Sequence, residues 1–445
     1  MPRRRNQKQL PTKLFEVTIK SLGHDGRGIA HIDGKTTFIS NALPDERILF
    51  KYTRKHSSFD EGEAFEILES SDQRIIAPCS YHAICGGCSM QHLEKKEQVK
   101  HKQSVLLNQL QHFGNTQPTE LLPPIIGPSW GYRHKARLSI RFVAKKGGVL
   151  VGFREKNGKY VTEMRSCEVL HESAGKKIVA IRKLISSLKD FSFIPQAEVA
   201  IGDNQTALVI RHLSELPEVD MEKIIEFGEE HSMEIYLQPS GIDSVHKIYP
   251  ENSPERLSYS LPDHNIEMLF HPCDFTQVNP FVNRKMVNQA IELLELNKDD
   301  NVLDLFCGLG NFTIPIAKYC ANITGIEADE RMVERGYENA KHNQATNINF
   351  YSANLEQDLS KHDWANQTYD KILLDPPRSG AEEIIKHFPN LSAKQIVYIS
   401  CNPATLARDA GELVHAQGYE LEKAGVMDMF PHTSHTESIA LFRKK

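Results

Sequence analysis

Hydrophobic and polar residues follow three different patterns along the chain. From Leu14 to about Ser70, short β-forming runs are broken by glycine, aspartate and proline, which is typical of a small β-barrel. Residues 71–261 contain one helix, over roughly 93–113, and several strands. From about 262 to 445, apolar strand runs alternate with helical segments, which predicts a doubly wound parallel sheet of the α/β class. We therefore expect three domains after a basic tail at 1–13.

The clearest period-two pattern lies in the segment "RHKARLSIRF". One side of the predicted strand carries Arg133, Lys135, Arg137 and Arg141, and the other carries Ala136, Leu138, Ile140 and Phe142. Cations that share one face of a strand repel each other, so contact with phosphates explains them better than plain solvent exposure does. The pattern favours a half-buried strand that presents a cationic face to a polyanion.

Composition and charge narrow the class of protein. The chain has 445 residues, 40% hydrophobic and 25% charged, as soluble globular proteins do. It contains no long apolar run, and its basic N-terminus precedes no signal-like segment, so we expect a cytoplasmic protein without membrane contact. The net charge of −5 hides an excess of basic residues at 1–60, with twelve Lys/Arg against six Asp/Glu. Such local excess indicates a nucleic-acid partner.

A glycine loop in "NVLDLFCGLGNFT" predicts a ligand site. Gly308 and Gly310 follow an apolar strand and precede a helix, and Glu327 ends the next strand, where it can accept hydrogen bonds from ribose hydroxyls. A dinucleotide-binding loop would carry a third glycine where Thr313 stands, and the neighbouring Phe306 and Asn311 are bulky. These residues favour a ligand smaller than a dinucleotide.

Two further strand ends carry reactive groups. In "ILLDPPRSG", Asp375 ends a strand before two stiffening prolines, and Arg378 follows them. In "QIVYISCNPATLARD", the next strand ends in Cys401. A buried packing role is the simpler explanation for a lone cysteine. A strand-end thiol can instead serve as a nucleophile in a sheet of this class.

One reaction that needs a thiol nucleophile is methylation at C5 of a pyrimidine. A thiolate that adds to C6 makes C5 reactive towards a methyl sulfonium, and a general base must then remove the C5 proton. The segment "MDMFPHTSHTESIALF" offers Glu437, just before the last strand, and His432 and His435 nearby. The residues alone leave the choice among these three bases open.

The remaining cysteines form a separate pattern. The segment "CSYHAICGGC" holds Cys79, Cys85 and Cys88, and Cys167 follows later in the chain. Thiolates at this spacing suit either zinc or an iron–sulfur centre. We expect Cys307 and Cys320 to be buried packing residues, whereas Cys273 has no evident role.

Several of these motifs resemble known families. The segment "DLFCGLGNFT" resembles the first motif of S-adenosylmethionine-dependent methyltransferases, and "SLGHDGRGIAHIDGKTTFISNALPDE" resembles a TRAM domain, an OB-like RNA-binding module. With "SCNP" and "DMFPHTSHTES" added, the whole chain resembles the RNA (uracil-5-)-methyltransferase family, and within it the RumA-type members that act on 23S ribosomal RNA.

The resemblance implies roles for individual residues. It makes Cys401 the nucleophile, Glu437 the base and Asp375 part of the substrate and methyl-donor pocket. It implies a [4Fe–4S] cluster on Cys79, Cys85, Cys88 and Cys167. The cofactor-binding positions that it implies are Gln277, Phe306, Gly308, Gly310, Asn311, Glu327, Asn354 and Asp375.

The expected activity is formation of 5-methyluridine in 23S ribosomal RNA, with S-adenosylmethionine as methyl donor and no obligate protein partner. A single active-site cysteine favours uracil over cytosine. Phe275 is a candidate for stacking on the flipped base. Two alternatives stay open: methylation of the T-loop uridine of tRNA, and a non-catalytic RNA-binding iron–sulfur protein.

Overall fold

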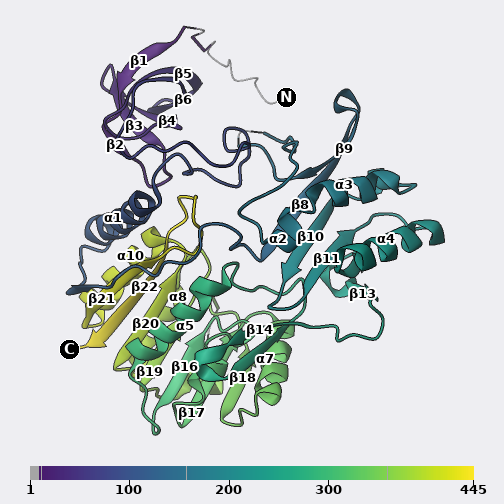
Figure 1. The fold of residues 1–445 in the computed structure, drawn as a ribbon. Coiled ribbons are helices and arrows are strands. Elements are labelled where there is room, and N and C mark those ends of the chain that lie inside the picture. The colour runs from purple at the N-terminus through teal and green to yellow at the C-terminus, as the bar shows by residue number, and fades with distance from the viewer. Residues whose placement is uncertain (1–9, 12, 157, 358) are drawn as a thin grey trace, which may run out of the picture. The chain divides into compact units, whose positions relative to one another are not determined.

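The structure is a computed structural model that describes residues 10–11, 13–156, 158–357 and 359–445. The basic tail predicted at 1–13 lies for most of its length outside the described residues. The chain divides into two compact units, which we call unit 1 (Met1–Val105 with Phe430–His435) and unit 2 (Leu106–Met429 with Thr436–Lys445). Figure 1 shows the elements of both.

Unit 1 contains a six-stranded sheet with the order β1-β5-β6-β4-β3-β2. Its strands are β1 (Phe15–Thr18), β2 (Ser21–Leu22), β3 (Gly28–Ile32), β4 (Lys35–Ser40), β5 (Arg47–Lys55) and β6 (Phe59–Glu69). Most are short and separated by tight turns, as the broken β-forming runs of this zone predict. The N-terminal part of the chain is therefore an all-β module.

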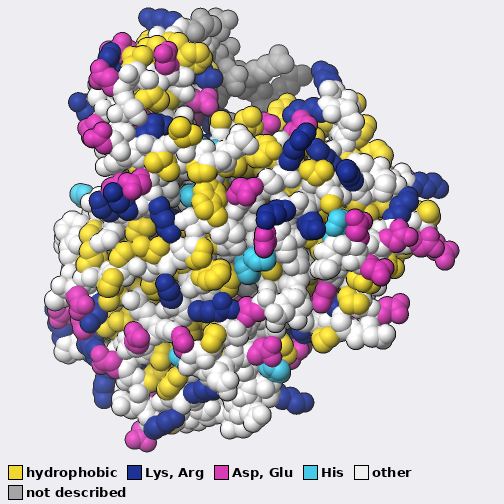
Figure 2. All heavy atoms as spheres, viewed as in Figure 1, with side chains coloured by type: hydrophobic (Ala, Val, Ile, Leu, Met, Phe, Trp, Pro, Cys, Tyr) yellow, Lys and Arg dark blue, Asp and Glu magenta, His cyan; other side chains and the backbone are white. Residues whose placement is uncertain are grey.

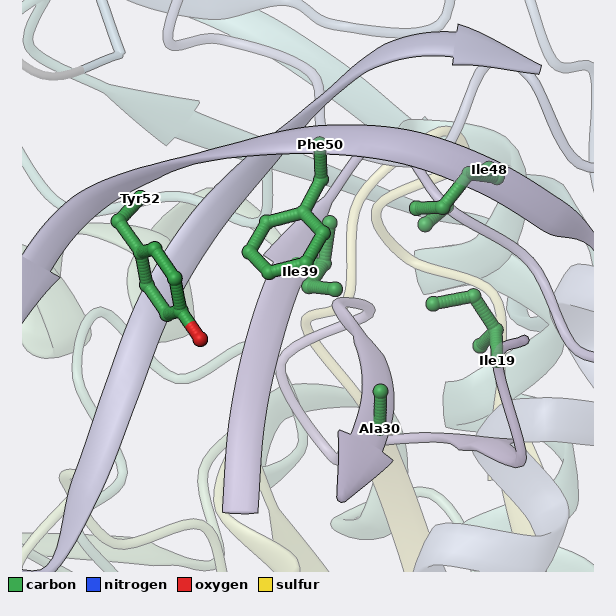
Figure 3. Packing of buried hydrophobic residues seen from close by; sticks show 7 residues of the cluster. Ile19, Ala30, Ile39, Ile48, Phe50 and Tyr52 are labelled. Atoms are coloured by element: carbon green, nitrogen blue, oxygen red, sulfur yellow. The ribbon is translucent and has the colours of Figure 1, made fainter. Parts of the chain in front are cut away.

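The core of this sheet is apolar and closely packed (Figure 3). Ile39 and Phe50 are fully buried, and the rings of Phe50 and Tyr52 meet edge to face with centroids 4.9 Å apart. Burial of one such side chain contributes about 1.5–3 kcal/mol. Gly62 on β6 has to be a glycine, because a Cβ there would lie 2.6 Å from the Phe50 ring. The core therefore fixes how β5 and β6 pair.

The remainder of unit 1 is a cysteine-bearing loop, the first part of α1 (Lys95–Phe113) and the segment 430–435. The observed helix confirms the one predicted over 93–113. Segment 430–435 is hydrogen-bonded to this part of the chain: the His432 carbonyl accepts from Ser89 N and Met90 N, each at 2.9 Å. The His432 amide in turn donates to Gln98 Oε1 at 2.9 Å. A stretch near residue 430 thus folds with the first hundred residues.

The first sheet of unit 2 has the order β13-β12-β11-β10-β8-β9. Its strands are β8 (Lys135–Val143), β9 (Gly148–Gly152), β10 (Gln196–Ile201), β11 (Thr206–Arg211), β12 (Glu234–Gln238) and β13 (His246–Tyr249), and its helices are α2 (Glu172–Gly175), α3 (Ile178–Ser187) and α4 (Glu218–His231). On β8, Leu138 and Ile140 are buried as their alternation predicts. Phe142, predicted on the same apolar side, is 55% exposed because it lies at the strand's end, next to the β8–β9 turn.

The larger sheet of unit 2 has the order β18-β17-β16-β19-β20-β22-β21-β7. Its strands are β7 (Glu120–Leu121), β16 (Asn301–Leu305), β17 (Asn322–Glu327), β18 (Ile348–Ser352), β19 (Lys371–Leu374), β20 (Gln395–Ser400), β21 (Tyr419–Met427) and β22 (Glu437–Lys444). The run from β18 to β20 is parallel, which confirms the predicted α/β sheet. The C-terminal hairpin departs from the prediction, because β22 pairs antiparallel with both β20 and β21.

Helices of this sheet are α5 (Pro280–Leu294), α6 (Thr313–Ile316), α7 (Glu330–His342), α8 (Glu382–Ile385), α9 (Phe388–Leu391) and α10 (Pro403–Gly411), and a hairpin of β14 (Leu257–Leu261) and β15 (Ile266–Phe270) precedes them. The chain runs from β16 outward to β18 on one side and then from β19 to β20 on the other. Ligands of open α/β sheets bind at the carboxyl ends of the strands where the order reverses, here between β16 and β19. Within the described part of the chain, no helix has the length and apolarity needed to cross a membrane.

Candidate active site

The topology of the larger sheet brings five chain segments to one edge. Strands β16, β17, β19 and β20 run parallel, so the residues that follow them share the carboxyl edge. Strand β22 runs the other way, and Ser438 pairs with Ser400. The amino end of β22, where Glu437 lies, is therefore beside the position of Cys401. Glu437 and Cys401 are neighbours because β22 runs antiparallel to β20, a direction that the sequence did not predict.

The glycine loop after β16 has an unusual backbone. Phe306, Gly308 and Gly310 all have positive φ, of 63°, 55° and 92°. For a bulky residue such as Phe306 this conformation costs about 1–3 kcal/mol, and such strain concentrates at functional sites. No atom lies within 4 Å of the place where a Cβ on Gly308 would stand. The loop thus leaves open space for a ligand beside its backbone.

The Glu327 carboxylate faces the same loop. Its Oε2 accepts from Gly308 N at 3.0 Å, and its Oε1 accepts from Ala328 N at 2.7 Å and from Asp329 N at 3.1 Å. Three backbone donors hold this carboxylate in one orientation at the end of β17. It is therefore a preorganised acceptor for hydroxyl groups of a ligand.

Asn311 and Asn354, two more predicted ligand residues, already have hydrogen bonds within the protein. Asn311 Oδ1 accepts from Tyr259 Oη at 2.8 Å, and Asn311 and Asn283 exchange hydrogen bonds at 2.9 and 3.0 Å. These contacts fix the glycine loop to β14 and α5. Asn354 is exposed after β18, and its Oδ1 accepts from Glu356 N at 3.0 Å.

Asp375 and Gln277 meet although 98 residues separate them in sequence. Gln277 Nε2 donates to Asp375 Oδ2 at 3.3 Å. Burial raises the pKa of Asp375 to about 7. The carboxyl group therefore changes its protonation state near neutral pH, and it can either donate or accept a hydrogen bond.

Asp304, which the sequence reasoning passed over, lies fully buried in β16. Its Oδ2 accepts from Thr313 Oγ1 at 2.5 Å, and among the described residues its Oδ1 has no hydrogen-bond partner. Burial first, and then the charges of Asp375 and Glu327, raise its pKa to about 7. An acidic residue inside the apolar run "NVLDLF" was the signal that could have identified it.

Asp304→Asn is expected to stabilise the protein at alkaline pH. Native Asp304 keeps its proton up to about pH 7, whereas the unfolded chain loses it near pH 4. Over that interval the native state binds more protons, so the free energy of unfolding falls by about 1.4 kcal/mol per pH unit. The stabilisation by Asn should thus grow from pH 5.5 to pH 7 and then level off. Melting curves across pH test this, with the exposed Asp299→Asn as control; a pH-independent difference would contradict it.

Cys401 lies between β20 and α10. Asn402 caps the helix by accepting from Ala404 N at 3.2 Å, and Pro403 takes its first position. A thiol at a helix N-terminus usually has a lowered pKa. Here burial, followed by the charges of Glu437 and Asp375, raises the pKa of the Cys401 thiol to about 11. The thiol is protonated at rest, and two carboxyl groups act on it electrostatically.

Hydrogen bonds join the loops that carry Asp375 and Cys401. Asn402 Nδ2 donates to the Arg378 carbonyl at 3.0 Å. Asp409 Oδ2 accepts from Ala381 N at 2.8 Å and from Tyr398 Oη at 2.7 Å. The two strand ends are therefore fixed relative to one another.

Alkylation of Cys401 by iodoacetamide should be slow and should still increase above pH 9. With a pKa of about 11, the thiolate fraction at pH 8 is about a hundredfold smaller than for an ordinary thiol. Glu437→Gln removes a negative charge, so alkylation at pH 8 should become roughly fivefold faster. Mass spectrometry of the Cys401 peptide measures the rate, and the exposed Glu412→Gln serves as control. Slower alkylation in Glu437→Gln would show that the carboxylate does not raise this pKa.

The two histidines offered as alternative bases belong to unit 1, whereas Cys401, Asp375 and Glu437 belong to unit 2. His432 is buried, and its backbone bonds to Ser89, Met90 and Gln98. His435 is exposed. Glu437 is thus the base candidate that lies in the same unit as the thiol.

The cationic strand is less uniform than its sequence pattern indicates. Lys135 donates to the Asp274 carbonyl, and burial lowers its pKa. Arg133 Nε donates to the Lys135 carbonyl at 2.9 Å, and Arg137 Nε pairs with Glu198 Oε1 at 2.9 Å. Arg141 is exposed. Three of the four predicted phosphate-binding cations therefore already contact protein groups.

Phe275 lies on the loop before α5 and is 71% exposed. The preceding Asp274 anchors this loop, because its Oδ2 accepts from Arg335 Nε at 2.9 Å and its carbonyl accepts from Lys135. The same loop carries Gln277. An exposed ring on an anchored loop remains available for stacking.

The cysteines divide between the units. Cys79, Cys85 and Cys88 share the loop of unit 1 between β6 and α1, and Cys167 belongs to unit 2. Among the described residues, no group of three or more His, Cys, Asp or Glu side chains is arranged to hold a metal ion. Cys307 and Cys320 are 4% and 5% exposed, which confirms their predicted packing role, and Cys273 is half-buried.

Two family descriptions match the chain. The description "tRNA (Uracil-5-)-methyltransferase" matches residues 244–445, which include the whole candidate site. The description "TRAM domain" matches residues 8–48, within the zone of the small β-sheet. The methyltransferase-like and TRAM-like segments recognised in the sequence fall inside these matches.

Relatives match over nearly the full length. The chain is 52% identical to a 23S rRNA (uracil(1939)-C(5))-methyltransferase RlmD of Alcanivorax borkumensis, over 99% of both chains. It is 46% identical to a protein of the same name from Francisella tularensis subsp. novicida, over 100% of both. Among solved structures, it matches a Pyrococcus abyssi tRNA (uracil-54, C5)-methyltransferase in complex with S-adenosyl-L-homocysteine. That match has a TM-score of 0.73 and 22% identity, and covers 96% of this chain and 100% of the other.

Proposed function

Because the chain belongs to the RNA (uracil-C5)-methyltransferase family, we propose that it methylates C5 of a uridine in 23S ribosomal RNA, with S-adenosylmethionine as donor. The observation that carries this proposal is the thiol of Cys401, with the carboxyl groups of Glu437 and Asp375, at the sheet edge that also bears the glycine loop. The proposed substrate, 23S ribosomal RNA, is taken from the names of the relatives that match the chain over its full length. Ribosomal RNA as substrate implies a cytoplasmic protein.

The proposed reaction makes and breaks one covalent bond to the protein. Cys401, once deprotonated, adds through Sγ to C6 of the flipped uracil, and C5 becomes an enolate-like carbon. C5 takes the methyl group that S-adenosylmethionine supplies, the methyl–sulfur bond of the donor breaks, and S-adenosylhomocysteine is the leaving group. Glu437 removes the C5 proton, the C6–Sγ bond breaks, and the C5–C6 double bond returns in 5-methyluridine. Asp375, whose pKa is about 7, can donate to or accept from the polar edge of the base.

The residues of the glycine loop fit the donor. The open space beside Gly308 admits a ligand, and the fixed Glu327 carboxylate offers acceptors for ribose hydroxyls. Glu327→Ala removes these acceptors, so the affinity for S-adenosylhomocysteine should fall about 10- to 100-fold, as expected for lost hydrogen bonds to a charged group. Calorimetric titration measures this, with the exposed Glu330→Ala as control. Equal affinity in both variants would reject Glu327 as a ligand residue.

We also propose an iron–sulfur cluster, [4Fe–4S], on Cys79, Cys85, Cys88 and Cys167. Three thiols on one irregular loop supply the soft donors that such a cluster needs. Among the described residues these side chains do not form a metal site, and the inclusion of Cys167 rests on the resemblance to the family. The cluster would order the loop or position RNA.

Removal of the cluster is expected to weaken RNA binding or folding without changing the chemistry of methyl transfer. Oxidation or chelation should lower RNA affinity and the melting temperature, while the rate at saturating RNA stays within about twofold, since the cluster loop lies outside the methyl-transfer residues. Iron content and visible absorption measure how much cluster is present. The variant Cys85→Ser removes a proposed ligand of the cluster, and Cys273→Ser is its matched control. Apo-protein that binds and methylates RNA normally would contradict this role.

The proposed function is tested with methyl-labelled S-adenosylmethionine, protein-free 23S rRNA and, separately, unmodified tRNA. Mass spectrometry of the nucleosides should find the label in 5-methyluridine from 23S rRNA alone. Label in 5-methyluridine from tRNA would support the proposed mechanism and show that the substrate is tRNA. An absence of label in both RNAs, with the cluster intact, would favour the non-catalytic RNA-binding protein or a substrate that exists only during ribosome assembly.

A further inference from the structure

A groove in unit 2 lies on the smaller sheet, whereas Cys401 follows a strand of the larger sheet. It is bounded by β9, the turn before β9, and α3, and its volume is about 490 Å³. Among the residues that the structure describes, strand β9 is the edge strand of its sheet, so backbone groups along one side of it have no neighbouring strand there. The groove is therefore a separate surface that the proposed chemistry leaves unused.

The groove is cationic. Lys146, Arg182 and Lys183 line it, and the one acidic residue of its lining is Glu163. Lys146 Nζ lies 3.8 Å from Glu163 Oε2, but both side chains are about half exposed, so this ion pair is weak. Besides Glu163, the carboxyl end of α3 opposes these charges, but its partial negative charge is smaller than that of the three cations. The balance favours an anion.

The other lining groups suit a phosphate-bearing chain. The hydroxyls of Ser186 and Ser187 bond to carbonyls of their own helix and can turn to an incoming oxygen. Gly147 and Gly148 have φ of 78° and 153°, and no atom lies within 4 Å of a Cβ built on either. A ligand can thus approach the backbone of the turn closely.

An exposed aromatic ring adjoins the groove. Phe142 pairs with Val149, a lining residue, so both side chains share one face of the β8–β9 hairpin. Phe142 is 55% exposed, and its ring lies 5.3 Å from that of Phe191. Dark blue Lys and Arg side chains gather over the region of β9 and α3 in Figure 2. Cations beside exposed rings are the combination that binds single-stranded nucleic acid, by phosphate contact and base stacking.

We propose that this groove binds a single-stranded stretch of the substrate RNA outside the target uridine. Lys146, Arg182 and Lys183 contact its phosphates, and one base stacks on Phe142. The proposal rests on the proposed function for the identity of the RNA. Because its described lining shares no residue with the site that carries the reacting groups, the groove contributes to RNA binding and not to the chemical step.

The test compares the full-length protein with a triple variant, Lys146→Gln/Arg182→Gln/Lys183→Gln. A charge-matched control, Lys341→Gln/Lys361→Gln/Lys386→Gln, changes exposed cations outside the groove. Binding to a 23S rRNA fragment is measured across salt concentrations. The slope of log K against log salt should be about two units less steep in the triple variant, because three single-strand phosphate contacts are lost. The control variant should keep the slope of the unaltered protein.

Further measurements separate the groove from the active site. In the triple variant KM for RNA should rise at least tenfold, while kcat and the Kd for S-adenosylhomocysteine stay unchanged. Phe142→Leu, which keeps an apolar side chain, should weaken RNA binding about tenfold through lost stacking. Bound RNA should protect Lys146 and Lys183 from acetylation. This measurement uses the unaltered protein and therefore needs no substitution.

A salt slope in the triple variant equal to that of the unaltered protein, or lost equally in the control, would overturn the proposal, as would acetylation of Lys146 and Lys183 unchanged by RNA. Failure of the proposed function is distinguishable, because it appears as absent methylation by the unaltered protein, whereas the salt slope and protection need no methyl transfer.

Discussion

Cys401→Ala is expected to abolish methyl transfer while RNA and the methyl donor still bind. Without Sγ nothing adds to C6, and C5 of uracil remains too poor a nucleophile to take a methyl group. The loss of kcat should be on the order of 10⁴-fold or more, as for other covalent nucleophiles. Single-turnover transfer of labelled methyl to 23S rRNA measures the rate, and filter binding measures RNA affinity.

Cys273→Ala is the matched control for this prediction, because Cys273 is also half-buried and its pKa is also raised to about 11 by burial. It should keep its methyl-transfer activity. Methylation by Cys401→Ala at a normal rate would mean that the nucleophile is another group. A non-catalytic RNA-binding protein would lose nothing in either variant.

Glu437→Gln is expected to accumulate a covalent adduct between protein and RNA. Addition of Cys401 and methylation of C5 can proceed, but the amide cannot remove the C5 proton, so the C6–Sγ bond persists. Loss of a general base lowers turnover on the order of 10²- to 10⁴-fold. A denaturation-resistant protein–RNA band, with the mass of the methylated adduct, measures this result.

Two controls make the adduct specific. The double variant Cys401→Ala/Glu437→Gln should form none, and Glu412→Gln, an exposed carboxylate after α10, should turn over normally. If Glu437→Gln forms no adduct and keeps its turnover, the base is His432 or His435. Because Glu437→Gln should speed alkylation of Cys401 only about fivefold, whereas unfolding would expose a thiol with an about hundredfold larger thiolate fraction, the alkylation rate recognises a well-folded variant independently of RNA.

The parallel part of the large sheet was predictable because its strands are short β-forming runs that alternate with helical segments. The placement of Asp375 and Cys401 at one edge followed from that pattern. The antiparallel direction of β22 did not, since a strand's apolar pattern is the same in either direction. The proximity of Glu437 to Cys401 was therefore available from the sequence only by resemblance.

Other features depend on tertiary contacts that local pattern does not encode. The strained backbone of Phe306 exists only because the surrounding loop imposes it. Lys135 follows the alternation of a solvent-facing cation, yet it donates to a carbonyl from a segment 139 residues away. Asn311 matches a ligand position, but its amide is bonded to Tyr259 and Asn283.

The chain passes from one compact unit to the other three times, at residues 105–106, 429–430 and 435–436. A single cut near residue 105 would therefore leave the fragments held together, because residues 430–435 stay hydrogen-bonded to the loop and helix before the cut. Glu437 lies only two residues beyond that returning segment. Unfolding of unit 1 would release one end of the strand that carries the proposed base. The chain connection therefore couples the stability of unit 1 to the position of a residue in unit 2.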